Sequence, residues 1–167
     1  MLDFTSKSLT NSLKSNLDDA LKSGKVIVSV IINGKEFPRK MYSRSPWALG
    51  VDDVEVKIYT NSTKKISKKI SVSDIDEIAL RVAKGFNNAP GIFMTQTLCL
   101  EMDMKIKEEN YQFICEDLGV IPSVFKWIQK NTINYTDFYN LENLYDENNE
   151  KEAIDILYSK IEEIQGR

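Results

Sequence analysis

The sequence predicts an α+β protein: an N-terminal helix and a small antiparallel sheet with a packed helix, followed by a mostly helical C-terminal half. Three observations predict this class. Leucines recur every fourth residue over 6–23, β-branched residues fill 26–32 ahead of a hairpin turn, and helical patterns dominate from about residue 105. With 167 residues, of which 42% are hydrophobic, the chain is long enough to form one ordinary domain with a sizeable core.

Residues 6–23 are predicted to form an amphipathic helix. Thr5 suits the N-cap position, and Gly24 suits the position just past the C-terminus, where a left-handed backbone is common. The single apolar stripe that would pack on the sheet comprises Leu9, Leu13, Leu17 and Leu21.

A β-hairpin is predicted next. The run 26–32 is rich in β-branched residues, which favour strands. Asn33 and Gly34 then form the favoured pair for a two-residue turn, because both residue types tolerate a positive φ. The return strand begins at Lys35. Pro38 predicts that this strand lies at an edge or stops early, because proline cannot donate a hydrogen bond to the ladder.

The remaining elements follow from hydrophobic periodicity. Alternation predicts two more strands, the second with a basic outer face: Val54, Val56 and Ile58, then Ile66, Ile70 and Val72. A helix is predicted over 74–86, whose apolar face contains Ile75, Ile78, Ala79, Val82 and Phe86. The apolar run 92–100 fits either a strand or a helix. A loop over 146–149 then precedes a last helix over about 150–164, with the stripe Ile154, Leu157, Ile161 and Ile164.

The best candidate for a boundary is 87–91, between a helix-plus-sheet half (1–88) and a mostly helical half (92–167). These halves either share one continuous core or form two. Their charges differ: residues 1–71 contain 13 Lys and Arg against 7 Asp and Glu (net +6), and residues 72–167 contain 9 against 18 (net −9). This division predicts two electrostatically distinct surfaces, unless the charges are only solvated faces.

The segment 111–130 has a regular apolar pattern. Cys115 is its small residue, Gly119 its turn residue, and the positions that would clamp two helices are Ile114, Leu118, Val120, Phe125 and Ile128. This pattern resembles the helix-turn-helix signature of bacterial regulators, which implies contacts with DNA by Lys126, Trp127 and Lys130. The net charge of residues 101–131 is −2, however, with four lysines against six acids. Because phosphate contacts dominate binding to a duplex, that charge favours an ordinary helical hairpin.

Cations and aromatic residues alternate in the hairpin region: Lys35, Arg39, Lys40, Tyr42, Arg44 and Trp47. Such a group suits RNA, single-stranded DNA or an acidic protein surface. Alternatively, its lysines protect an edge strand from aggregation. A second group consists of lysines only, which indicates a solvated face: Lys64, Lys65, Lys68 and Lys69.

An acidic stretch with tyrosines lies near the C-terminus. Its contact candidates are Asp137, Tyr139, Glu142, Tyr145 and Asp146, with Tyr135, Phe138 and Glu147 beside them. Carboxylates among aromatic rings can imitate a nucleic-acid surface or dock on a basic groove of another protein. The alternative is an ordinary charged helix face whose aromatic residues point inward.

The sequence gives little support for catalysis. It contains no histidine, no glycine-rich phosphate loop and no nucleophile elbow. Cys99 and Cys115 have apolar neighbours, which indicates inert thiols. The carboxylate pairs Asp52/Asp53, Asp74/Asp76 and Glu101/Asp103 are expected by chance in so acidic a chain. We therefore expect no enzyme activity, no cofactor and no bound metal.

Neither a signal peptide nor a membrane-spanning run is evident, so we expect a soluble, cytoplasmic protein. The abundance of Lys, Ile and Asn indicates an AT-rich genome and fits a low-GC bacterium or one of its phages. The leading hypothesis is a non-enzymatic protein that acts by protein–protein contact, as a phage or mobile-element inhibitor or adaptor of host nucleic-acid machinery. The alternatives are a helix-turn-helix DNA-binding regulator and a virion or assembly component. The oligomeric state stays open.

Overall fold

The computed structural model describes residues 25–33, 35–36, 47–60, 66–87, 95–115 and 117–164. The helix predicted over 6–23 lies outside these residues. Within them the α+β class is confirmed, and the elements are β1 (Lys25–Ile32), β2 (Lys35–Glu36), β3 (Trp47–Val51), β4 (Glu55–Thr60), β5 (Ile66–Ser71), η1 (Val72–Asp74), β6 (Glu77–Asn87), β7 (Thr95–Ile106), β8 (Glu109–Cys115), η2 (Leu118–Val120), α2 (Ile121–Lys130), β9 (Tyr135–Asp137), α3 (Leu141–Glu147) and α4 (Glu150–Ser159).

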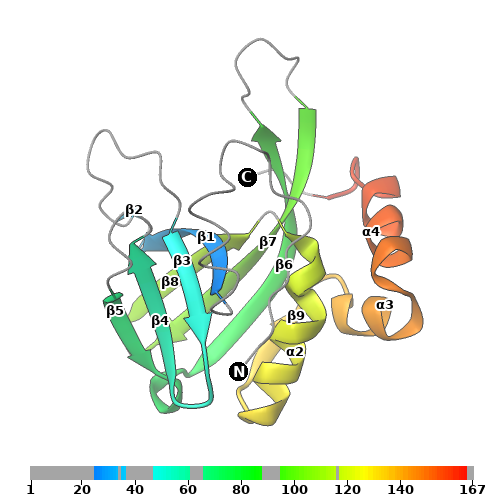
Figure 1. Cartoon of the computed structure of the whole chain (residues 1–167). Coiled ribbons are helices and arrows are strands. Elements are labelled where there is room, and N and C mark those ends of the chain that lie inside the picture. The colour runs from blue at the N-terminus through cyan, green and yellow to red at the C-terminus, as the bar shows by residue number, and fades with distance from the viewer. Residues whose placement is uncertain are drawn as a thin grey trace.

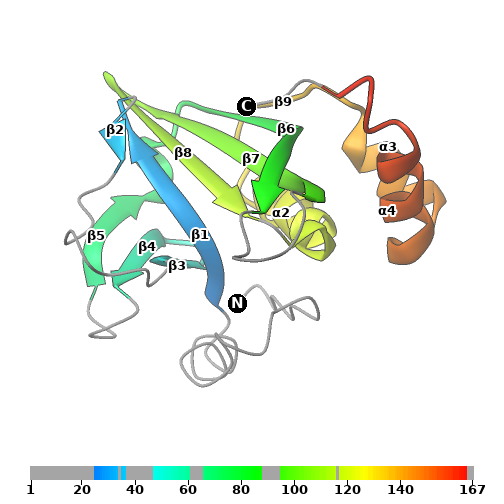
Figure 2. The same ribbon diagram turned by 90° about the horizontal axis from the view of Figure 1, so that it is seen from above.

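The strands form two sheets that share β1. The order is β5-β4-β3-β1-β8-β7-β6-β9, and β2 pairs with β1. The first half of β1, Lys25–Val28, pairs with β3, whereas Ser29–Ile32 pairs with β8. All pairings are antiparallel except that of β6 with β9. Figure 1 shows α2 beside β6 and β9, and Figure 2 shows α3 and α4 beyond them, on the side away from β5.

The predicted hairpin after β1 is confirmed. Ile32 pairs with Lys35, so two residues form the turn, and Asn33 has a φ of 50°. The described part of the strand β2 is Lys35–Glu36, and Pro38 lies outside the described residues.

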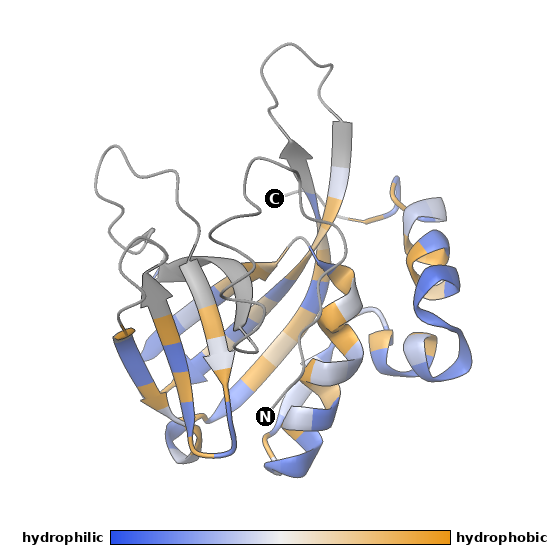
Figure 3. Ribbon diagram, in the orientation of Figure 1, coloured by the Kyte–Doolittle hydropathy of each residue, from blue (hydrophilic) through white to orange (hydrophobic). Residues whose placement is uncertain are grey.

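The strand predicted from Val56 and Ile58 is also confirmed. The side chains of Val56 and Ile58 in β4 are fully buried. Hydrophobic and hydrophilic residues alternate along this strand (Figure 3). Val54 was expected on the same inner face, but it lies in the turn before β4 and is 69% exposed. The following strand is present as β5, where Ile70 is buried and Ile66 is exposed.

The helix predicted over 74–86 is wrong, because residues 77–87 form β6. Ile78, Leu80 and Val82 alternate along this strand and are buried. The strand pairs with β7 from Glu77 opposite Lys105 to Asn87 opposite Thr95, so its amides bond to a neighbouring strand. This pairing also joins the two sides of the expected boundary at 87–91 in one sheet.

The mostly helical half is wrong over 95–115. The ambiguous run 92–100 enters β7 at Thr95, and residues 109–115, expected to be helical, form β8. In the described part of this half, the first α-helix is α2. Pro122 lies in its first turn, where the amide hydrogen that proline lacks would have no partner within the helix.

The C-terminal helices differ from prediction in their bounds. α3 includes Asp146 and Glu147, which were expected in a loop. α4 begins with a capping box of Asn149 and Glu152. It ends at Ser159, before the predicted end at residue 164. No helix in the described part of the chain has the length and apolar character needed to cross a bilayer.

One cluster of buried hydrophobic side chains runs through the molecule. It contains residues of both sheets, among them Ile58 and Leu80, and residues of the described helices α2, α3 and α4, such as Ile128, Leu141 and Leu157. The two sheets and the C-terminal helices therefore pack on one another, which fixes the position of α3 and α4 relative to the sheets.

Candidate protein interface

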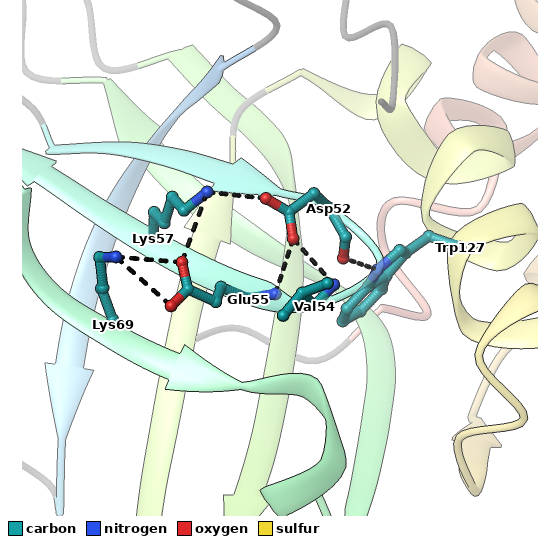
Figure 4. Close-up of polar contacts among 6 residues, drawn as sticks. All are labelled: Asp52, Val54, Glu55, Lys57, Lys69 and Trp127. Carbon is teal, nitrogen blue, oxygen red and sulfur yellow. Dashed lines mark hydrogen bonds and ion pairs between the residues drawn. The ribbon is translucent and has the colours of Figure 1, made fainter.

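The helix-turn-helix pattern does not form two helices. Its first half is the strand β8, and only its second half is helical, as α2. Trp127, a candidate for contact with DNA, is 2% exposed, and its Nε1 donates a hydrogen bond to the backbone oxygen of Asp52 at 2.9 Å (Figure 4). This hydrogen bond therefore connects α2 to the turn between β3 and β4.

The turn between β3 and β4 is held by the side chain of Asp52. Its Oδ1 accepts hydrogen bonds from the amides of Val54 (2.8 Å) and Glu55 (2.7 Å), and its Oδ2 lies 2.7 Å from Nζ of Lys57 (Figure 4). The bond from Lys57, together with the two amides, lowers the pKa of Asp52 from 3.8 to about 2. Because the turn folds in this way, Val54 points to solvent.

The two lysines of α2 differ in their surroundings. Nζ of Lys130 lies 2.6 Å from Oδ2 of Asp53, and this bond lowers the pKa of Asp53. Lys126 is exposed. The cation at the end of α2 is thus matched by a carboxylate of the neighbouring turn.

Most of the basic hairpin group lies outside the described residues. The backbones of Lys35 and Trp47 lie in β2 and β3, but their side chains are outside the described residues. The same holds for the whole of Arg39, Lys40, Tyr42 and Arg44. The expectation that this group makes contacts stays a prediction.

The other two carboxylate pairs also have partners within the fold. Arg81 lies 2.6 Å from Glu101 and 3.6 Å from Asp103, all on adjacent strands β6 and β7. Lys107 lies 3.5 Å from Asp74, and its amide donates to Asp76 at 2.7 Å. Within the described ranges, no group of three or more acidic or cysteine side chains is arranged to hold a metal ion.

The two cysteines are buried. Sγ of Cys99 donates to the backbone oxygen of Ala83 at 3.4 Å, and Sγ of Cys115 donates to the backbone oxygen of Asp117 at 3.6 Å. Their positions in β7 and β8 are consistent with structural thiols.

Three of the acidic contact candidates have structural partners. Oδ2 of Asp137 accepts a hydrogen bond from the amide of Glu142 at 2.9 Å, which caps the first turn of α3. Glu142 itself accepts bonds from Gln129 of α2 and from the hydroxyl of Tyr135, the latter at 2.5 Å. These carboxylates therefore join α2, β9 and α3.

The third candidate with a structural partner is Tyr145, which is part of the core. Its hydroxyl donates to the backbone oxygen of Leu118 at 3.0 Å, so the residue connects α3 to η2. Burial, together with the nearby carboxylates of Glu150 and Asp117, raises the pKa of Tyr145 well above its usual range. The phenol therefore stays protonated and keeps this donor.

The other two candidates lie on the surface. Tyr139 is 37% exposed, and Asp146 is exposed on α3. Carboxylates close to them in sequence are exposed too, and none of the following forms an ion pair with any other described residue: Asp146, Glu147, Glu150, Asp155 and Glu163.

Exposed aromatic rings accompany these carboxylates. Phe138 is 61% exposed and Tyr158, on α4, is 40% exposed. Residues 135–164 contain nine acids against Lys151 and Lys160, a net charge of −7. We define the acidic surface by the following exposed residues of this segment: Phe138, Tyr139, Asp146, Glu147, Glu150, Asp155, Tyr158 and Glu163.

Sequence reasoning missed the contribution of α4 to this surface. The stripe from Ile154 to Ile164 predicts the buried face of the helix, and Leu157 and Ile164 are buried. Asp155 and Tyr158 lie between the stripe positions, so the helical period that identified the core also identifies them as exposed. Comparison with known proteins finds no matching family model and no matching curated protein.

Proposed function

We propose that this chain is a non-enzymatic binding protein that acts by protein–protein contact, with the acidic surface as its contact face. The observation that carries the proposal is the combination, on and next to α3 and α4, of exposed aromatic rings and of carboxylates that form no ion pair with another described residue. An acidic surface of this charge attracts a basic one over several ångströms and accelerates association. Exposed tyrosine and phenylalanine rings add apolar area of the kind that interface centres contain.

The proposed partner is a protein with a basic surface of the kind that binds nucleic acid. Carboxylates spaced along α3 and α4 are chemically similar to phosphates in charge and in hydrogen-bond acceptance. Nucleic acid itself is disfavoured as a ligand of this face, because a net charge of −7 over residues 135–164 repels a phosphate backbone. On this proposal, the protein competes with nucleic acid for its partner.

Capture from a nuclease-treated bacterial lysate tests the proposal. The bait is the full chain, compared with the single variants Asp146→Lys and Asp155→Lys. Glu108→Lys is the matched control, because Glu108 is an exposed acid in the turn between β7 and β8 and undergoes the same change of charge. We expect a basic protein to be retained by the parent and the control, and to be lost with either variant of the acidic surface.

Two further measurements decide the outcome. After the nuclease is washed away, a DNA duplex added to the captured material should displace the partner, because both ligands would use one basic surface. Rising salt should weaken capture, since exposed charges are screened at short range. Retention of the same proteins by all four baits, or capture that DNA leaves unchanged, would contradict the proposal in favour of another face or another class of partner.

A further inference from the structure

A groove of about 320 Å³ lies between α3 and the C-terminal half of α4. Its apolar lining includes Leu144 from α3 and Leu157 and Ile164 from α4 and the turn after it. Ile156 is half-buried and forms part of the same lining, although it lies off the stripe of α4 that packs on the core. Tyr139 adds an exposed ring to the groove.

Charged and amide groups surround this apolar lining. Glu147 and Glu163 contribute two carboxylates against the single ammonium group of Lys160, so the rim carries a net negative charge. The side-chain amides of Asn140 and Asn143 are bonded to each other at 2.7 Å. The segment therefore offers an apolar hollow with a negative rim, and it lies within the acidic surface.

We infer that this groove binds a basic amphipathic helix of another protein, whose apolar side chains enter the hollow while its lysines or arginines face the carboxylates. The inference rests on the proposed function and names the element of the partner that makes the contact. Charge complementarity supports it, because a cationic helix face meets Glu147 and Glu163 of the rim and the −7 charge of residues 135–164 around it.

The size of the groove fits this occupant. A cavity of about 150 Å³ accommodates a ring the size of benzene, so a groove of about twice that volume accommodates two large apolar side chains. Residues one helical turn apart, at i and i+4, present such a pair on one face at about 6 Å. Docking of an amphipathic helix by anchors with this spacing is a recurring mode of recognition between proteins.

Fluorescence anisotropy with synthetic peptides tests the inference. The probe is a labelled peptide with leucines at i and i+4 on one helical face and lysines on the other. One counterpart replaces the leucines by serine and keeps the charge; a second replaces the lysines by glutamate and keeps the leucines. We expect the first counterpart to bind the full chain about tenfold more weakly and the second not to bind, since both features are needed.

Variants of the protein locate the contact. Ile156→Gln should weaken binding of the leucine–lysine peptide about tenfold, because the anchor then meets a polar group. Glu147→Gln combined with Glu163→Gln should weaken it about fivefold and flatten its salt dependence. Glu108→Gln is the matched control, since Glu108 is exposed, lies in the turn between β7 and β8 and does not line the groove. Circular dichroism of each variant verifies that it folds.

The outcomes separate this inference from the proposed function. Equal affinity for the leucine and serine peptides, or no effect of Ile156→Gln, overturns the groove as the binding site. If the leucine and serine peptides then both bind the Asp146→Lys variant more weakly than the parent, the acidic surface binds by charge alone and the proposed function stands. If no peptide binds, the groove inference is overturned, and capture of a basic protein alone decides the proposed function.

Discussion

Replacing Asp52 tests how the turn between β3 and β4 is stabilised. In Asp52→Asn the amide oxygen can still accept hydrogen bonds from Val54 and Glu55, but the charge that pairs with Lys57 is lost. In Asp52→Ala the turn loses all three bonds. The difference between the two variants therefore separates the ion pair from the hydrogen bonds within the turn.

The magnitude follows from the pKa of Asp52. Lowering it from 3.8 to about 2 corresponds to about 2.4 kcal/mol in favour of the folded, ionised form. The side chain is 39% exposed, so solvent screening reduces the expected loss in Asp52→Asn to about 1 kcal/mol. The loss in Asp52→Ala should be larger, about 2 kcal/mol, because two turn amides exchange their acceptor for water.

The dependence on pH has a definite sign. Because the folded pKa is below the unfolded one, the stabilisation is fully present above about pH 4 and is lost as the pH falls through about 2. The difference in free energy of unfolding between parent and Asp52→Asn should thus fall to about half by pH 3. Urea unfolding followed by tryptophan fluorescence between pH 7 and pH 3 measures it.

The control and the refuting result are equally definite. Asp155→Asn changes an exposed carboxylate of α4 that makes no ion pair with another described residue, and its free energy of unfolding at pH 7 should equal that of the parent. The reasoning is wrong if Asp52→Asn is as stable as the parent at pH 7. It is also wrong if the deficit is the same at pH 3 as at pH 7.

Three further changes probe the packing. Trp127→Phe should cost about 2 kcal/mol in urea unfolding, because the bond to Asp52 is lost and the smaller ring leaves a void. Leu141→Ala should cost about 3 kcal/mol, because Leu141 is fully buried in the core; a loss under about 1 kcal/mol would mean that α3 packs loosely. Gly119→Ala should cost less than about 1 kcal/mol, because the nearest atom to the new methyl group, 2.9 Å away, is the flexible end of Glu150. Glu150→Ala should reduce that cost and leave the 3.2 Å contact with Oδ1 of Asp117.

Local signals predicted β1, its turn and β4 correctly. Each is determined within a few residues: a β-branched run, an Asn-Gly pair, and the alternation of Val56 and Ile58 with charged residues. The same reasoning placed Val54 on the inner face, because alternation cannot show where a strand begins. The side chain of Asp52 determines that start by bonding to the amides of the turn.

Periodicity failed where it fits two structures. Ile78 and Val82 are four residues apart, as on a helix face, but Leu80 between them completes a two-residue alternation. The choice is made by β7, whose partner residues lie up to 28 positions away in the chain, from Glu77 opposite Lys105. Intrinsic propensity within one segment contains no information about such a partner.

The strand β8 shows a second cause of failure. Phe113 belongs to the main core, whereas Ile114 is buried on the other side with Ala83 and Cys99. A strand buried on both faces has no alternation and cannot be distinguished from a buried helix by its apolar residues. The helix-turn-helix resemblance arose from this continuous run.

The contact surface could be predicted only in part. The net charge of the C-terminal segment and its tyrosines are visible in the sequence, but the roles of individual residues are not. Asp137 and Asp146 are the same residue type, yet Asp137 caps α3 and Asp146 faces solvent. That difference depends on where the chain turns between β9 and α3, at Asn140, whose φ is 54°.

The distribution of ion pairs explains why α3 and α4, rather than the sheets, present the available charge. Carboxylates of the sheets such as Glu55 and Glu101 have cations from neighbouring strands, so a ligand there would first have to separate an existing pair. Asp146 and Asp155 form no such pair with any described residue. Each exposed pair with an incoming lysine would contribute little alone, but several carboxylates on two short helices act together on an approaching basic surface. Binding by this face should therefore depend more steeply on salt than the stability of the fold does.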